Sequence, residues 1–189
     1  MSNNLLENFS SKYDFVSWPD QDEFLEGPTR DKSYYEYITD VYNSSYTYIQ
    51  FDNFVYWFTD KDDLTQKNIS KRIIYYSIFN KCAPRIRAWK MNVTNIRIFN
   101  HNPLDGDKYP INFKLRHYPF RNIDHFYKRL YKDRSGLERN GNNYHYNAML
   151  KNLNSILAIN STMFHIDDGI NDLNSIEKFD WDIVYKNSV

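Results

Sequence analysis

Hydrophobic positions along the chain follow two periods, one typical of helices and the other of strands. Apolar residues spaced three and four positions apart predict helices at 5–13, 34–42, 123–134 and 149–159. Runs rich in Tyr, Ile, Val and Phe predict strands at 15–18, 46–57, 85–90, 96–99 and 113–118, of which 85–90 alternates as a half-buried strand does. The apolar segment 71–79 and the tail from residue 161 show no clear period.

Local signals place the ends of several of these elements. Ser33 and Glu36 form the pattern of a capping box before one helix, and Asn122 is a suitable N-cap for the next. Gly27 and Pro28 interrupt the segment between strand and helix. We expect an α/β fold, a mixed sheet flanked by helices, with one domain at 1–160 and an extension at 161–189 that packs on it.

Composition excludes several classes of protein. The chain has 189 residues with 24 basic and 24 acidic side chains, so it lacks the basic excess typical of nucleic-acid binders. Its single cysteine, Cys82, permits neither an intramolecular disulfide nor a cysteine zinc site. The sequence shows no secretory signal and no apolar run of about 20 residues, which predicts a cytoplasmic protein without a membrane span.

Two carboxylates one residue apart, Asp20 and Asp22, follow the predicted strand at 15–18. In an extended backbone, residues i and i+2 point to the same side, so both side chains would converge on one point. Mg²⁺ and Mn²⁺ prefer such oxygen ligands and commonly bridge them to a substrate phosphate. The pattern therefore predicts a metal–phosphate clamp. The alternative interpretation is a solvated turn, where Asp-x-Asp is also common.

A second polar segment joins the predicted strand at 113–118 to the predicted helix at 123–134. Arg116 and His117 come at the end of the strand, and Arg121 lies just before the helix. Guanidinium groups and the N–H groups of a helix N-terminus favour anions, and an imidazole can bind a metal. The segment therefore suits a substrate that carries a diphosphate. The alternative is a hydrogen-bonded histidine beside two surface arginines.

Taken in order, these segments resemble family 2 glycosyltransferases of the GT-A fold, in particular a bacterial and viral branch. The resemblance covers roughly residues 13 to 147. The matching segments are Asp20-Gln21-Asp22-Glu23-Phe24, Tyr56-Trp57-Phe58-Thr59-Asp60, Ala88-Trp89-Lys90, Asn100-His101, Leu115 to Asn122, and Asn143-Tyr144-His145. The Arg-His-Tyr-Pro element within Leu115 to Asn122 is fairly specific, whereas Asp-x-Asp is not.

The resemblance implies transfer of a sugar from a nucleotide-sugar donor to a glycan, protein or lipid acceptor. It implies that Asp20 and Asp22, with His117 as a third ligand, hold Mn²⁺ or Mg²⁺ against the donor diphosphate. Arg116 and Arg121 would add charge-assisted contacts to the same oxygens.

Transfer with inversion also needs a carboxylate base near the acceptor hydroxyl. The candidates for this base are Asp52, Asp60 and Asp62. The resemblance places His101 and His145 on the acceptor side, with a purely structural role as the alternative for each.

The sequence departs from the family pattern ahead of Asp20. In GT-A enzymes a strand–helix half that binds the nucleotide base precedes the Asp-x-Asp, and this sequence has no counterpart of it. We therefore expect a truncated GT-A-like domain, with a separate chain as a candidate source of that half. Two alternatives in function stay open: a non-catalytic remnant or interaction module with the same fold, and a metal-dependent phosphohydrolase that uses the same carboxylates.

Overall fold

The structure, a computed structural model, describes residues 12–79, 85–91, 106–131 and 144–185, with 96–97 and 102–103 as short strands. For residues 96–97, 102–103, 144–147 and 185 only the backbone is described. Most of the helix predicted at 5–13, the end of the helix predicted at 123–134, and His101 lie outside the described residues.

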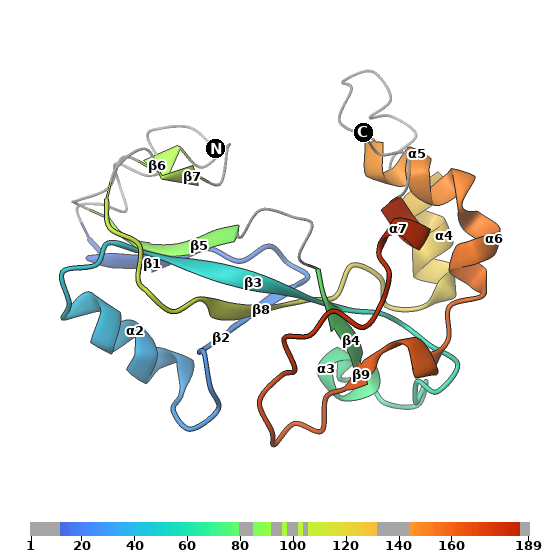
Figure 1. Ribbon diagram of the computed structural model, residues 1–189, viewed down its shortest axis with the longest axis horizontal. Coiled ribbons are helices and arrows are strands. Elements are labelled where there is room, and N and C mark those ends of the chain that lie inside the picture. The colour runs from blue at the N-terminus through green and yellow to red at the C-terminus, as the bar shows by residue number, and fades with distance from the viewer. Residues whose placement is uncertain are drawn as a thin grey trace. The chain divides into compact units, whose positions relative to one another are not determined.

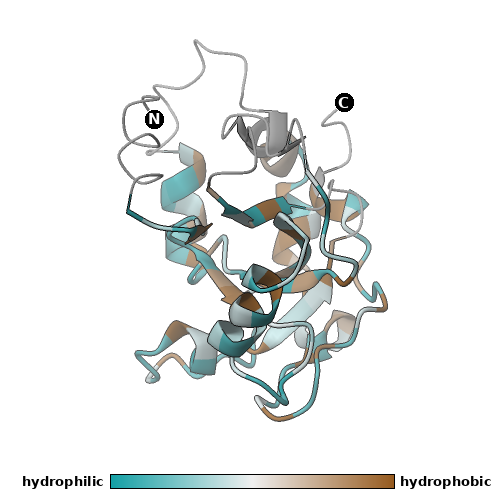
Figure 2. Ribbon diagram, turned by 90° about the vertical axis from the view of Figure 1, so that its left-hand side faces the viewer, coloured by the Kyte–Doolittle hydropathy of each residue, from teal (hydrophilic) through white to brown (hydrophobic). Residues whose placement is uncertain are grey.

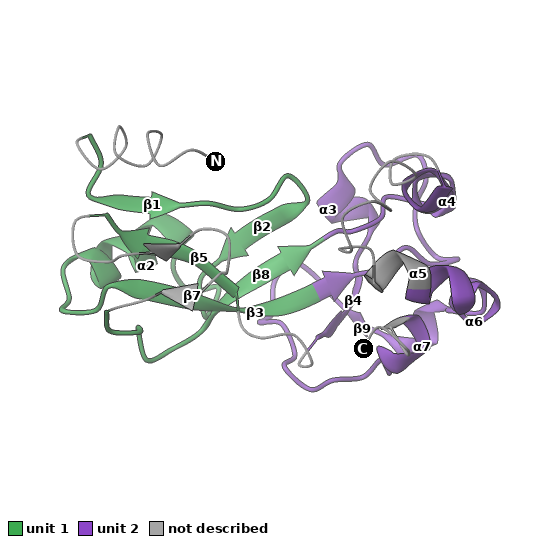
Figure 3. Cartoon of the chain, turned by 90° about the horizontal axis from the view of Figure 1, so that it is seen from above, with its two compact units in different colours: residues 1–54, 80–117 green, residues 55–79, 118–189 purple. Residues whose placement is uncertain are grey.

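The chain divides into two compact units, and each is described by itself (Figure 3). Unit 1 comprises residues 1–54 and 80–117, and unit 2 comprises residues 55–79 and 118–189. The tail from residue 161, which the sequence predicts to be an extension, belongs to unit 2.

The described residues form six helices and a seven-stranded antiparallel sheet, so the fold is mixed α/β (Figure 1). The strands in unit 1 are, in sheet order, β1 (Phe15–Ser17), β5 (Arg85–Lys90), β3 (Tyr48–Tyr56), β8 (Phe113–His117) and β2 (Glu23–Glu26). A separate two-stranded sheet pairs β6 (Ile96–Arg97) with β7 (Asn102–Pro103). The last two residues of β3 belong to unit 2.

The prediction of a mixed sheet is wrong for the described strands. Strands β2 and β3 do run in the same direction, and the helix α2 (Tyr34–Tyr42) connects them. Strand β8 lies between them, however, and pairs with both, so no two parallel strands of this sheet are neighbours. A sequence reveals the crossover but not which later strand occupies the position between its two ends.

The capping box before α2 is confirmed, and the helix packs on the core of unit 1. Tyr34 and Tyr37 meet the ring of Phe113 edge-on, at centroid distances of 6.1 and 5.6 Å. A Cβ at Gly27 would overlap the ring of Tyr37, so glycine lets the chain leave β2 close to that ring. The buried core here comprises Val41, Ile49, Phe51, Ala88, Phe113 and Leu115.

We expect Ser33→Ala to lower the free energy of unfolding by about 1 kcal/mol. Ser33 Oγ accepts a bond of 3.3 Å from the Glu36 amide, and Glu36 Oε2 accepts one of 2.7 Å from the Ser33 amide. Urea denaturation measures the loss. Ser33→Thr, which keeps the hydroxyl, is the matched control; equal losses in both variants would mean that the hydroxyl does not stabilise α2.

Unit 2 combines the end of β3 with short strands and helices. Strand β4 (Tyr75–Ile78) pairs antiparallel with β9 (His165–Ile166). The helices are α3 (Ile69–Arg72), α4 (Ile123–Tyr131), α5 (Tyr144–Lys151), α6 (Leu153–Leu157) and α7 (Asp182–Tyr185), with a 3-10 turn at Ser161–Met163. The segment 71–79 thus holds a helix end and a strand, and the helix predicted at 149–159 is interrupted at Asn152.

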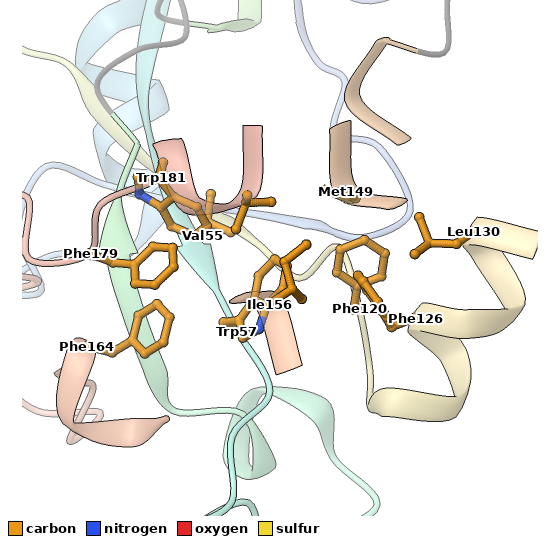
Figure 4. Packing of buried hydrophobic residues seen from close by; sticks show 11 residues of the cluster. Val55, Trp57, Phe120, Phe126, Leu130, Met149, Ile156, Phe164, Phe179 and Trp181 are labelled. Carbon is orange, nitrogen blue, oxygen red and sulfur yellow. The ribbon is translucent and has the colours of Figure 1, made fainter. Parts of the chain in front are cut away.

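The core of unit 2 is mainly aromatic, and the tail supplies much of it (Figure 4). The rings of Phe164 and Phe179 stack at 4.8 Å, and Trp181 meets Phe179 edge-on at 4.8 Å. Trp57 and Phe126 extend the cluster toward α4. Burial of such rings supplies most of the stabilisation of a small unit like this one.

No helix of the described residues combines the length and hydropathy needed to cross a membrane. In Figure 2 the hydrophobic parts of the coloured ribbon are short and are interrupted by hydrophilic ones.

Candidate functional site

The segment that carries Asp20 and Asp22 is a turn between β1 and β2. The Glu23 amide donates to the Asp20 carbonyl at 3.0 Å, and the Asp20 amide donates to Glu23 Oε2 at 3.0 Å. The extended backbone that we assumed for these carboxylates is therefore wrong, because a turn does not place residues i and i+2 on one side. A turn here was the alternative interpretation.

Behind this turn lies a buried ion-pair cluster that sequence reasoning missed. Arg87 of β5 contacts Glu23 twice, Nε to Oε2 at 2.8 Å and a second guanidinium nitrogen to Oε1 at 2.8 Å. The side chains of Arg87 and Glu23 are 5% and 0% exposed. Arg85 also pairs with Glu23.

Strand β5 is buried on both faces between its two end residues. The half-buried alternation predicted for this strand is therefore wrong.

The cluster changes the ionisation of Glu23. Burial alone would raise the pKa of this carboxyl. The hydrogen bond from Arg87, the backbone amide of Asp20 and the charges of Arg87 and Arg85 outweigh burial and hold the pKa below its ordinary value. Glu23 is therefore a structural carboxylate with its charge already compensated.

The pairing of β2 with β8 places the two polar segments side by side. Glu23 lies opposite His117 and Phe24 opposite Arg116 in the register of the strands. As a result, His117 Nε2 lies 3.7 Å from Asp22 Oδ2. Two segments more than ninety residues apart in the sequence thus meet at one end of a strand pair.

The predicted metal ligands differ in their contacts. Asp20 Oδ2 accepts a contact of 2.7 Å from Arg87, so the charge of this carboxylate is already partly compensated. Asp22 instead faces an imidazole, which can bind a metal itself. The Nδ1 atom of His117 is buried without a hydrogen-bond partner among the described residues. Asp22 Oδ2 and His117 Nε2 can together supply one oxygen and one nitrogen ligand to a divalent cation.

No group of three or more His, Cys, Asp or Glu side chains in the described part of the chain is arranged to hold a metal ion. On the same strand pair, Arg116 Nε lies 3.7 Å from Glu26 Oε2, and Arg30 binds the same carboxylate at 2.6 Å. Arg116 and His117 are consecutive in β8, so their side chains leave opposite faces of the strand.

The remaining predicted residues are spread over both units. Asp52 in unit 1 accepts a hydrogen bond of 2.8 Å from the side chain of Asn112. Asp60 and Arg121 belong to unit 2 and are exposed. His145 lies on α5, in the first turn, for which only the backbone is described. Of the predicted site residues in unit 1, the structure therefore brings Asp22 and His117 together.

A pocket of about 380 Å³ lies within unit 2. Its walls come from the loop after β3, from the start of α4 and from the end of α6. They consist of Phe58, Thr59, Asp60, Asp62, Leu64, Asn122, Ile123, Asp124, Ile156, Leu157 and Ile159. Sequence reasoning placed Ile123 and Ile156 on helix faces but had no signal that these faces and the acidic loop meet.

Comparisons with protein-family models, with curated proteins and with solved structures found no match to this chain.

Proposed function

We propose that the chain acts in glycosyl transfer, with Asp22, His117 and Arg116 binding the diphosphate of a nucleotide-sugar donor through Mn²⁺ or Mg²⁺. One observation supports this most: β2 and β8 pair so that the Asp-x-Asp and Arg-His-Tyr-Pro segments adjoin. The proposal includes a partial GT-A fold, a glycan-type acceptor and a location in the cytoplasm.

In this proposal each residue has a separate task. Asp22 and His117 supply an oxygen and a nitrogen ligand from one side. Arg116 contacts the diphosphate oxygens, and Glu26 keeps its guanidinium in place. The bound cation would stabilise charge on the leaving diphosphate as a Lewis acid. Asp52 and Asp60 stay predictions for the base that accepts the proton of the acceptor hydroxyl.

A specific observation favours the second function, a non-catalytic interaction module. Asp20, one of the two carboxylates of the motif, is bound to Arg87, and Glu23 is neutralised by two arginines. A region whose carboxylates are paired in this way can serve structure alone.

Calorimetric titration of the chain with a panel of nucleotide sugars, with and without Mn²⁺, separates the two functions. We expect donor binding that needs Mn²⁺, and Asp22→Asn to weaken it by at least about tenfold, as loss of a ligand does. Asp40→Asn, an exposed carboxylate on α2 that pairs with Lys32, is the control and leaves binding unchanged. Absence of donor binding by the folded wild-type chain would exclude the transferase and leave the module.

A further inference from the structure

The pocket in unit 2 includes none of Asp22, His117 and Arg116, the residues proposed to bind the donor, which all belong to unit 1. At about 380 Å³ it falls in the range of small-molecule sites. Sequence and comparisons assign no ligand to it.

Much of the wall is apolar, and part of this apolar surface is uncovered. Ile156 forms the buried end of the wall, with 2% of its surface exposed. Leu64 and Leu157, by contrast, are 73% and 48% exposed. Large aliphatic side chains in contact with water at a concave site gain about 25 cal/mol per Å² when a ligand covers them. The pocket therefore favours a ligand with an apolar body.

The polar part of the wall has one sign of charge. Asp60 and Asp62 come from the loop after β3, and Asp124 comes from the first turn of α4. Among the described residues, no lysine, arginine or histidine lines the pocket. Two cations lie near the pocket. Lys61 lies 3.9 Å from Asp60, with both side chains more than half exposed. Arg72 donates to the Arg121 carbonyl, and its charge also acts on Asp62.

We propose that this pocket binds a small organic cation, a protonated amine attached to an aromatic or branched aliphatic group. The amine meets the three carboxylates, and the apolar group covers the leucine and isoleucine side chains. An anion is disfavoured by the same carboxylates. A bare divalent metal is disfavoured by the apolar wall, and no metal-binding group of three was found among the described residues.

The ionisation of Asp62 supports this assignment. Burial raises the pKa of Asp62 to about 6, although Thr59 hydrogen bonds and the charge of Arg72 act in the opposite direction. A carboxyl that costs energy to ionise in the free protein gains most from a cation beside it. Amine affinity should therefore rise with pH as Asp62 ionises, because an alkylamine stays protonated over this range. Other charged groups on the segments around Asp62 are Asp60, Lys61, Asp63, Arg72 and Asp124.

Titration with 2-phenylethylamine and with its neutral counterpart 2-phenylethanol tests the proposal on the full chain. The two probes share one apolar group and differ in charge. We expect the amine to bind at least about tenfold more tightly than the alcohol, a difference of about 1.4 kcal/mol. Equal affinities, or no saturable amine binding up to about 10 mM, would overturn the proposal.

Two charge-removing variants sharpen the test. Asp62→Asn should weaken amine binding by at least about tenfold and leave alcohol binding unchanged. Asp63→Asn is the matched control: it removes the same charge from the same loop, lies outside the lining, and keeps the oxygen that accepts from Thr65. An amine affinity that is the same in wild type and Asp62→Asn, or that falls equally in both variants, would contradict recognition by Asp62. Thermal unfolding verifies that the variants remain folded.

Discussion

Arg87→Met is expected to lower the free energy of unfolding by about 3–5 kcal/mol, as removal of one partner from a buried ion pair does. The substitution leaves the fully buried carboxylate of Glu23 without its two contacts to this guanidinium. Arg85, which is 25% exposed, remains as its partner. The loss also releases Asp20, whose bond to Arg87 fixes the turn after β1. Urea denaturation at neutral pH measures the change.

A double variant separates a buried unpaired charge from lost packing. Glu23→Leu combined with Arg87→Met removes both charges, and a buried pair replaced by apolar residues is often close to neutral. We expect the double variant to lose less stability than Arg87→Met alone. A loss in the double variant as large as the sum of the two single losses would show that the pair does not act as a unit.

The pH dependence follows from the sign of the shift at Glu23. Because its pKa is lowered in the folded state, its contribution is present above the unfolded value of 4.5 and is lost as the pH falls through the folded value. In Arg87→Met, Glu23 stays buried but loses this partner, so its pKa is raised. Protonation of Glu23 then removes the uncompensated buried charge and reduces the loss of stability. The stability gap between wild type and variant should therefore narrow below about pH 4.5. A gap independent of pH would contradict this account.

Elements with local signals could be predicted from the sequence. Ser33 and Glu36 specify a helix start through groups three residues apart, and Asn122 caps α4 by accepting from the His125 amide at 2.8 Å. The strands β3, β5 and β8 lie within the predicted ranges. In each case the residues that decide the structure lie within one short segment.

Features that depend on distant partners could not be predicted. Arg87 looks like a surface residue of an alternating strand until Glu23, 64 positions away, is known to lie against it. The position of β8 between β2 and β3 also depends on segments far apart in the sequence. So does the pocket in unit 2. At the candidate site, the sequence predicted Asp22 and His117 as site residues. It did not predict Arg87, whose guanidinium forms an ion pair with the Asp20 carboxylate.

Trp181→Ala is the second large expected loss, about 3–5 kcal/mol, as for other large-to-small changes at a buried aromatic residue. Trp181 is 0% exposed, and its ring packs against Phe179 and Trp57. Its Nε1 donates to the Ile78 carbonyl on β4 at 2.9 Å. Alanine therefore opens a cavity and leaves a buried carbonyl without that donor.

Two further substitutions divide this loss into its parts. Trp181→Phe keeps a six-membered aromatic ring but removes the N–H donor, so it should cost clearly less than alanine. Leu157→Ala, at a side chain that is 48% exposed, should cost less than either. Hydrogen exchange adds a local measure, because the Phe179 amide donates to Ser77 Oγ in the same region. If Trp181→Ala lowers the free energy of unfolding no more than Leu157→Ala does, the tail does not stabilise unit 2. The largest loss in Trp181→Ala and the smallest in Leu157→Ala would instead make residues 161–185 part of the core of unit 2.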